Sequence, residues 1–290
     1  MLAGCGRSGT TWLAEIIAAR LSGRIMFEPF HAHRVERLKE LQYFHYLRPT
    51  DTNALLAEYS EDVFSGRIQH IWVDKVVDRL LPRYRIVKDI RANLFLKWLH
   101  LRFPQVPLVF MLRHPCAVVL SRLRVNWATD SDIKPLLAQP RLIEDHLGEF
   151  MEVIRRARTI EEKHAVIWCV SNLVPLRQFA ADGLPVVFYE DLCMNPGEVV
   201  PAVFRSIGQM SESCHSRTIA KPSSTVRGTS AIVRGSDPVR GWTVRLAPDQ
   251  IRNILNIVDA FGLSALYGDS VTPLSPRNLA LGLTSIGELG

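Results

Sequence analysis

A glycine-rich loop at residues 4–11, with the sequence GCGRSGTT, constrains this chain more than any other feature. It has the outline of a phosphate-binding loop, with Thr11 at the expected hydroxyl position, but Thr10 replaces the lysine that usually precedes it. The cation lies inside the loop instead, at Arg7. Glycines let successive backbone N–H groups face one anion, and a following helix adds its positive end. The loop therefore predicts a nucleotide-phosphate site without the lysine-and-magnesium arrangement of a kinase.

The rest of the chain alternates short apolar runs with helical periods. Apolar residues at helical spacing follow the loop over residues 10–21. Strands are predicted at 1–3, 24–27, 85–88, 107–112 and 185–189, and helices at 10–21, 92–102, 116–124, 141–157, 161–180, 197–207 and 248–261. Such alternation predicts an α/β fold, one domain with a central parallel sheet flanked by helices. Ligands then bind at the carboxyl ends of the strands.

A second anion site is predicted about 100 residues after the loop. The apolar run at 107–112 ends in Arg113, and Pro115 suits the first turn of a helix that carries Ser121. A guanidinium at a strand end beside a helix hydroxyl suits a terminal phosphate better than a metal ion. No metal site is predicted.

Together these motifs resemble the sulfotransferase superfamily. In that family the loop, here extending to Trp12, binds the 5′-phosphosulfate of PAPS (3′-phosphoadenosine 5′-phosphosulfate). An Arg followed eight residues later by Ser, as in Arg113 and Ser121, recognises its 3′-phosphate. The resemblance implies that PAPS is the cosubstrate and PAP the product. It assigns these residues to PAPS binding: Gly6, Arg7, Ser8, Gly9, Thr10, Thr11, Trp12, Arg113 and Ser121.

Two further segments extend the resemblance. The family often has Tyr-Glu-Asp-Leu after a strand, with the Tyr near the adenine, and Tyr189 opens that segment here. A basic C-terminal region then grips the 3′-phosphate, for which Arg227 is the candidate, with Arg234 and Arg240 as alternatives. The chain departs from the family pattern in having Arg-Gly-Trp at 240–242 where cytosolic members have Gly-Asp-Trp.

The resemblance also assigns the catalytic pair. Arg7 is expected to stabilise the leaving phosphate electrostatically, and Glu28 to act as the base, as a Glu does about twenty residues after the loop in members that act on sugars or protein tyrosine. Pro29 keeps the chain extended, and flanking Phe27 and Phe30 are expected to raise the pKa of Glu28. Lys88 is a candidate bridge between cofactor and acceptor.

The acceptor is less constrained. Segments 30–84 and 125–165, where the family builds acceptor pockets, contain little periodicity, although Tyr43, Phe44, Tyr46 and Trp127 offer aromatic faces. The Glu-Pro layout favours a carbohydrate or glycolipid hydroxyl over a small phenol as the group that is sulfated. We therefore expect the binding partner to be a small-molecule or carbohydrate acceptor.

Composition narrows the classes of function that remain open. A net charge of +6 without a dense Lys/Arg run fits an anionic cofactor better than nucleic acid. Five cysteines without metal spacing indicate reduced thiols in a cytoplasmic protein, and no apolar stretch is long enough to span a membrane. We expect residues 1–268 to form the sulfotransferase domain and 269–290 a loose tail. With three residues before Gly4, the first strand is either short or begins upstream.

Two other functions remain open from the sequence. A magnesium-dependent P-loop kinase or NTPase would need Glu190 or Asp191 to hold the metal after the strand at 185–189. A non-catalytic nucleotide-binding module would bind the cofactor without turnover. The sequence does not determine the oligomeric state.

Overall fold

The computed structural model describes residues 1–76, 82–127, 130–209 and 237–274. Its core is a five-stranded sheet in which every pairing is parallel and the strand order is β2-β3-β1-β4-β5. The strands are β1 (Leu2–Gly4), β2 (Gly23–Phe27), β3 (Tyr84–Asp89), β4 (Val109–Leu112) and β5 (Val186–Phe188). The predicted α/β class is confirmed, and each strand lies within two residues of its predicted bounds.

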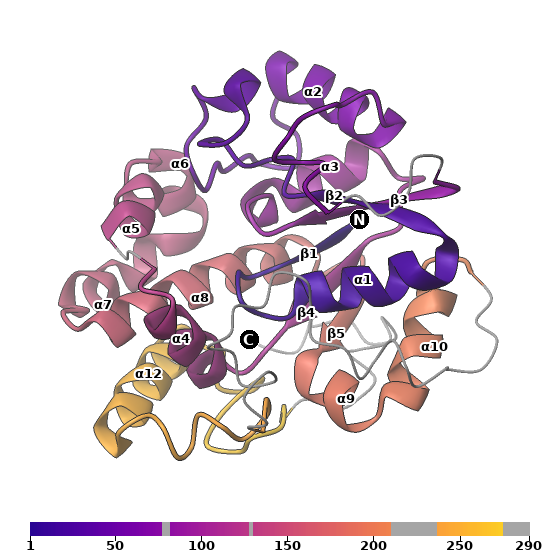
Figure 1. Cartoon of the computed structure of the whole chain (residues 1–290). Helices are drawn as coiled ribbons and strands as arrows, with labels where there is room; N and C mark the ends of the chain where they lie inside the picture. The colour runs from indigo at the N-terminus through magenta and orange to yellow at the C-terminus, as the bar shows by residue number, and fades with distance from the viewer. Residues whose placement is uncertain (77–81, 128–129, 210–236, 275–290) are drawn as a thin grey trace.

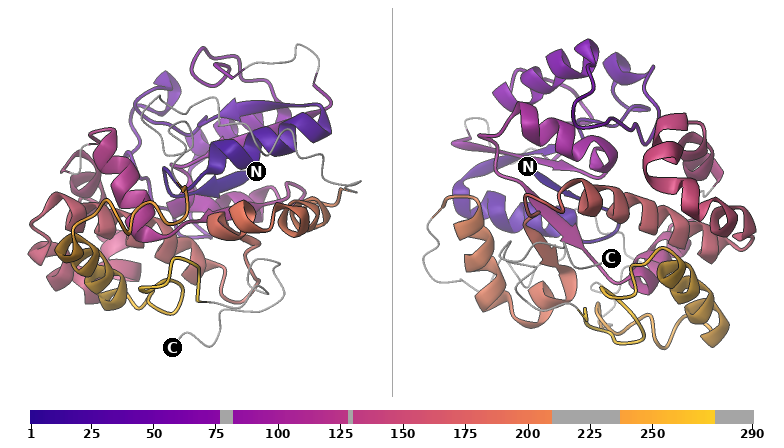
Figure 2. Two further views of the ribbon diagram at one scale, coloured as in Figure 1. Left: turned by 60° about the horizontal axis from the view of Figure 1, so that its bottom comes forward. Right: turned by 180° about the vertical axis from the view of Figure 1, so that it is seen from behind.

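Alternate residues of each strand enter different cores, as the period of two requires. On one face Leu2, Ile86 and Met111 pack with α1 (Thr10–Leu21) and α10 (Pro196–Ser206). On the other face Ala3 and Phe110 belong to a second apolar core. The helices of that face are α2 (Ala54–Ser65), α3 (Leu96–Arg102), α4 (Pro115–Arg124), α8 (Ile160–Gln178) and α12 (Pro248–Ala260). The sheet is thus the middle of three layers (Figures 1 and 2).

Helix α8 lies at the centre of one outer layer because it is apolar on nearly all sides. Its packing partners include α4 and α12. A capping box starts it: the Thr159 hydroxyl accepts from the Glu162 amide, and the Glu162 carboxylate accepts from the Thr159 amide at 2.9 Å. Viewed from behind, α8 crosses the sheet as the central helix of that layer (Figure 2, right).

The structure differs from the sequence prediction at four places. The helix expected at 141–157 is interrupted: α6 (Pro140–Leu142) leads into a π-turn at Ile143–Leu147, a 3₁₀ turn at Gly148–Phe150 and α7 (Met151–Arg156). Gly148 at this junction weakens a continuous α-helix. Helices α2 and α5 (Asp130–Leu137) fall where little periodicity was found, and α5 contains Pro135. Tyr189 begins the short helix α9 (Tyr189–Met194) and does not end β5.

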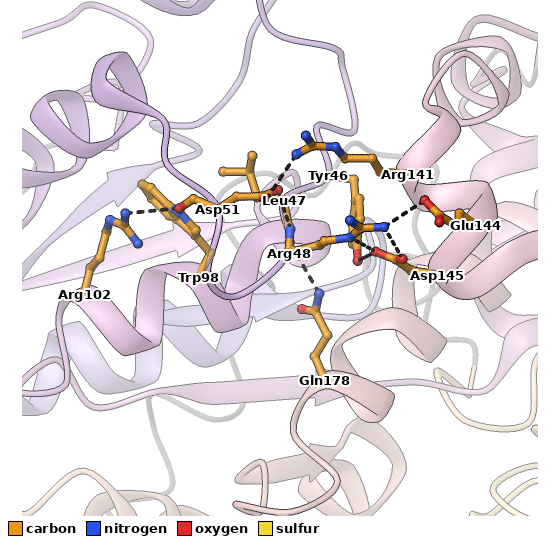
Figure 3. A network of polar contacts seen from close by, with 10 residues as sticks. All are labelled: Tyr46, Leu47, Arg48, Asp51, Trp98, Arg102, Arg141, Glu144, Asp145 and Gln178. Atoms are coloured by element: carbon orange, nitrogen blue, oxygen red, sulfur yellow. Dashed lines mark hydrogen bonds and ion pairs between the residues drawn. The ribbon is translucent and has the colours of Figure 1, made fainter.

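The chain between β2 and α2 is fastened to the π-turn by a polar network (Figure 3). Arg48 donates from Nε and Nη2 to the two carboxylate oxygens of Asp145, both at 2.7 Å, and from Nη2 to Glu144 at 2.8 Å. The Tyr46 hydroxyl donates to Asp145 at 2.7 Å. These contacts fix residues 46–48, and Tyr43 just before them lies 4.0 Å from the guanidinium carbon of Arg91, which follows β3.

Candidate functional site

The glycine loop connects β1 to α1 in the geometry that the sequence predicts. The Ser8 amide donates to the Cys5 carbonyl at 3.1 Å, which closes the turn. Gly9 has φ +93°, and a Cβ there would lie 2.5 Å from the Tyr189 ring. Only glycine fits this position, both by conformation and by space. The loop thus leads directly into the amino end of α1, where backbone N–H groups favour an anion.

Arg7 links the two predicted anion motifs. Its backbone has φ 79°, in the left-handed region. Its Nε donates to the hydroxyl of Ser121 on α4 at 2.9 Å. Residues 114 positions apart in sequence therefore meet at one point, as the prediction of a single nucleotide site requires.

Arg113 lies at the end of β4 and contacts the same loop. Its Nη1 donates to the Arg7 carbonyl at 3.0 Å and its Nη2 to the Pro238 carbonyl at 2.8 Å. Its guanidinium carbon lies 4.0 Å from the centre of the Tyr189 ring, and that ring meets Trp12 edge to face at 5.8 Å. Burial raises the pKa of Tyr189, so its hydroxyl stays protonated at neutral pH.

Three buried polar atoms at this place fit a bound nucleotide. The Ser8 hydroxyl, Trp12 Nε1 and Arg113 Nε have no hydrogen-bond partner among the described residues. An unpaired buried polar group costs about 1–3 kcal/mol, so three of them around one loop indicate that a polar ligand completes the site. A hydroxyl, an indole N–H and a guanidinium N–H are all able to donate to phosphate and nucleotide oxygens.

Glu28 forms a separate centre at the end of β2. Its side chain is buried, and the Lys88 Nζ lies 2.6 Å from Oε1. Burial on its own raises the pKa of this carboxyl, but the charges of Lys88 and Arg91 outweigh burial and lower the pKa. The expected rise in pKa is therefore wrong: the adjoining cations, absent from the local sequence pattern, dominate over Phe27 and Phe30.

Asp89, at the end of β3, shapes the turn that carries Glu28. It is fully buried and accepts from the backbone amides of Phe30 at 2.9 Å, Arg91 at 2.6 Å and Ala92 at 3.0 Å. Burial raises its pKa to about 6. The sequence analysis did not single out Asp89 or Arg91; their place directly after Lys88 at a strand end is the signal that finds them.

The strand order arranges these groups in a row. Arg7 follows β1, Lys88 ends β3, and Glu28 follows β2, so Lys88 lies between the two predicted catalytic residues. At about 4.8 Å per strand, Arg7 and Glu28 are about 10 Å apart across the sheet edge. The structure thus groups Arg7, Ser121, Arg113, Tyr189 and Trp12 at one centre and Glu28 with Lys88 at a neighbouring one.

Two predicted segments, the basic C-terminal region and the tail, do not join the two centres described above. Arg227 and Arg234 lie outside the described residues, and Arg240 is exposed in the turn at 237–246. In that turn Trp242 is buried and stacks on His114 at 4.3 Å. Most of the predicted tail at 269–290 is also outside the described residues. In the described part, no helix is both long and apolar enough to cross a membrane.

Glu190, one of the two residues on which the kinase alternative depends, is fully buried. Its Oε1 accepts from the His114 amide at 2.9 Å and its Oε2 from the Tyr267 hydroxyl at 2.8 Å. Both oxygens thus join β4, β5 and the chain after α12. This carboxylate serves the packing of the domain, and its geometry does not favour magnesium binding.

The structure is an α/β domain whose glycine-rich loop between β1 and α1 carries Arg7 and has Thr10 at the position of the usual lysine. The model of the sulfotransferase family matches residues 1–210 of the 290, so the chain belongs to the sulfotransferase family. Among solved structures it is similar to mouse sulfotransferase SULT7A1 complexed with PAP, at 14% identity and a TM-score of 0.44, over 93% of this chain and 85% of that one. No curated protein sequence matches it.

Proposed function

We propose that this sulfotransferase uses PAPS and transfers the sulfuryl group to a hydroxyl of a carbohydrate or glycolipid acceptor. The observation that carries the proposal is the hydrogen bond between Arg7 and Ser121, because it joins the phosphate loop to the second anion motif. A P-loop kinase has no need of a second phosphate-binding motif at this position. An enzyme that binds a nucleotide with phosphate groups at both its 5′ and 3′ positions needs such a motif.

The nucleotide would be held by residues from three strand ends. The loop amides and hydroxyls suit the 5′ end, Tyr189 and Trp12 the adenine, and Arg113 with Ser121 the 3′-phosphate. Nη1 and Nη2 of Arg113 each donate one N–H to a carbonyl, so the Nε N–H, a second N–H on each Nη and the charge remain for the ligand. The proposed set is Gly6, Arg7, Ser8, Gly9, Thr10, Thr11, Trp12, Arg113, Ser121, Tyr189 and Arg227.

PAPS, when bound, supplies the sulfuryl group and a phosphate leaving group. Arg7 is permanently charged and acts electrostatically, without donating a proton. Its fixed place in the loop, held by Ser121 and by the turn at Cys5, means that little reorganisation is needed as charge develops. Lys88, one strand away, brings a second cation between Arg7 and Glu28.

Glu28 is proposed as the base. Because its pKa is lowered, it is a carboxylate at neutral pH and can accept the proton of an acceptor hydroxyl. The same ion pair with Lys88 weakens it as a base. Base strength in this site is therefore controlled by Lys88, since a longer separation between the two would raise the pKa of Glu28.

Calorimetric titration with PAP, and separately with ADP plus magnesium, tests the cofactor. We expect PAP to bind more tightly than ADP plus magnesium. Arg113→Ala should weaken PAP binding by about 10- to 100-fold, because one charge-assisted contact contributes about 1.5–3 kcal/mol. Arg252→Ala is the control, since Arg252 pairs only with Asp249 on the surface of α12. Preference for ADP-magnesium, or equal loss in both variants, would contradict the proposal.

A further inference from the structure

A segment beyond the edge of the sheet lies next to Glu28. The Phe27 amide on β2 donates to the Val73 carbonyl at 2.9 Å, so residues 70–76 run along the outer side of the edge strand. Read from the nucleotide loop outward, the order is Arg7, Lys88, Glu28 and then this segment. The segment therefore lies on the side of Glu28 that faces away from the nucleotide.

Two cations of this region lie against one indole ring. The Lys75 Nζ is 3.5 Å from the centre of the Trp72 ring and 3.6 Å from that of Phe27, and the Arg34 guanidinium carbon is 5.0 Å from Trp72. Both cations are exposed, and neither forms an ion pair with a described residue. Lys88 also approaches Phe27, at 4.3 Å, but it is paired with Glu28.

The nearby carboxylates do not offset these charges. Asp74, in the same segment, pairs with Arg24 at 2.5 Å and accepts from the His70 amide at 2.9 Å. Asp89 is saturated by three backbone amides. Burial lowers the pKa of Lys75, and the charge of Arg34 lowers it further, so the two cations lie close enough to repel each other. The charge of Glu28 raises the pKa of Lys75, but Glu28 is itself paired with Lys88, so cations outnumber carboxylates here and the cluster suits an anion.

The cofactor does not reach this site. Residues 70–76 are three strand spacings from β1, about 14 Å, on the far side of Glu28 from the loop. The anion bound by Lys75 and Arg34 must therefore belong to a different ligand from the one bound by Arg7 and Arg113.

Aromatic faces line the same region. His31 meets Trp72 and Tyr43 edge to face, each at 5.3 Å, and His33 stacks on Tyr43 at 4.5 Å. The faces of Tyr43 are already covered, since His33 stacks on the ring and the Arg91 guanidinium carbon lies 4.0 Å from its centre. Trp72 is half-buried and offers part of its ring to solvent beside Lys75 and Arg34. An apolar ring surface beside cations suits a partly polar ring that carries a negative charge.

We propose that the acceptor is an anionic sugar, which packs against the exposed part of Trp72 and places a carboxylate or sulfate group between Lys75 and Arg34. This inference rests on the proposed function, because it names the acceptor class of the same site. Lys75 and Arg34 are then specificity residues, and the hydroxyl to be sulfated lies toward Glu28.

Matched glycosides test the charge directly. With saturating PAP, tryptophan fluorescence gives the affinity of p-nitrophenyl glucuronide against the glucoside, which lacks the carboxylate. A second pair, p-nitrophenyl N-acetylglucosaminide with and without a 6-sulfate, tests the sulfate. We expect the charged member of at least one pair to bind about tenfold more tightly, an ordinary effect of one partly exposed ionic contact. The pair that discriminates identifies the acidic group.

Variants separate charge from stacking. Lys75→Met and Arg34→Met should bring the two members of the discriminating pair within twofold while the neutral member binds as before, whereas Trp72→Ala should weaken the neutral member as well. Lys39→Met is the control, because Lys39 is exposed and pairs with Glu36. Equal binding within both pairs, or no binding of any glycoside, overturns the anionic acceptor while intact PAP binding leaves the proposed function standing. Loss of PAP binding itself would overturn the proposed function first.

Discussion

At the scale of single residues, backbone strain is found where the proposed chemistry lies. Four described residues other than glycine have positive φ: Arg7, Ser22, Glu28 and Asn126. Ser22 and Asn126 lie just after helices α1 and α4, where the left-handed conformation is ordinary. Arg7 and Glu28 are not at helix ends. A non-glycine residue there costs about 1–2 kcal/mol, and such strain typically marks residues held for function.

The ion pair between Lys88 and Glu28 gives a prediction for the pKa of the base. In Lys88→Met the cation is lost while burial remains, so the pKa of Glu28 should rise above its value in the unchanged protein. Carboxyl NMR with labelled glutamate measures it, and the Glu28→Gln spectrum assigns the signal. A glutamate base works only when ionised, so the acid limb of turnover should move to higher pH in step.

The control for this prediction is Lys39→Met, since Lys39 is exposed and pairs with the exposed Glu36 and not with Glu28. Its Glu28 signal should titrate as in the unchanged protein. An unaltered or lowered pKa in Lys88→Met would mean that Arg91 and the other neighbours, and not Lys88, set the state of this carboxyl.

At the scale of elements, helix α4 holds the phosphate loop from the side. Ser121 accepts from Arg7, and the next residue, Arg122, is buried and donates from Nη2 to the Cys5 sulfur at 3.3 Å. Successive residues of one helix thus contact successive parts of one loop. The orientation of α4 is itself fixed at its first turn, where Pro115 follows the His114 cap.

Ser121→Ala tests this contact between helix and loop. Arg7 would lose the hydrogen bond that orients its guanidinium, so we expect PAP affinity to fall about 5- to 20-fold, from a charge-assisted hydrogen bond worth about 1–2 kcal/mol. Calorimetry measures the affinity, and thermal unfolding should change little. Ser206→Ala, which removes a hydroxyl bonded to the Val203 carbonyl in α10, is the matched control. Equal affinity in Ser121→Ala and the unchanged protein would remove Ser121 from the site.

Elements were predictable where local pattern and burial agree. The loop, α1 and the five strands could be predicted because glycines and apolar runs of fixed period identify them, and Arg113 and Ser121 followed from a strand end and a helix start. The π-turn at Ile143–Leu147 was not predictable, because it depends on Arg48, about 97 residues away, binding Asp145. The lowered pKa of Glu28 was missed for the same reason: Lys88 is distant in sequence and adjacent in the sheet.

At the scale of the whole molecule, one strand order serves both proposed ligands. Strands β2 and β3 lie on one side of β1, and β4 and β5 on the other, so the nucleotide loop after β1 lies where the strand order reverses. One half of the sheet edge therefore presents Arg7, Arg113 and Tyr189. The other half presents Lys88, Glu28 and the segment at 70–76. The two proposed substrates therefore approach from opposite ends of one row, and the cations of that row account for the positive net charge of the chain better than a nucleic-acid surface does.

The buried histidines predict how stability of the whole domain depends on pH. Burial lowers the pKa of His31 and His114 to about 4 and that of His164 to about 3. Below about pH 6.5 the unfolded chain binds these protons and the folded protein does not, so stability falls as pH falls. Asp89 and Glu190 act in the opposite direction, because burial raises the pKa of Asp89 to about 6 and also raises that of Glu190, so the folded protein binds these protons first. Three histidines outweigh these two carboxyls between pH 6.5 and 4.

Urea unfolding from pH 7.5 to 5 measures the slope of the unfolding free energy against pH. Each proton that the unfolded chain binds and the folded protein does not increases this slope by up to about 1.4 kcal/mol per pH unit. His114→Gln should flatten it by about one proton, because His114 is fully buried between Trp242 and Tyr267. Gln42→Ala, at an exposed residue that does not titrate, should leave it unchanged. If stability is flat or rises toward pH 5, the histidines must be protonated in the fold, and the packing of Trp242 and Tyr267 around His114 would then have to admit water or a counter-charge.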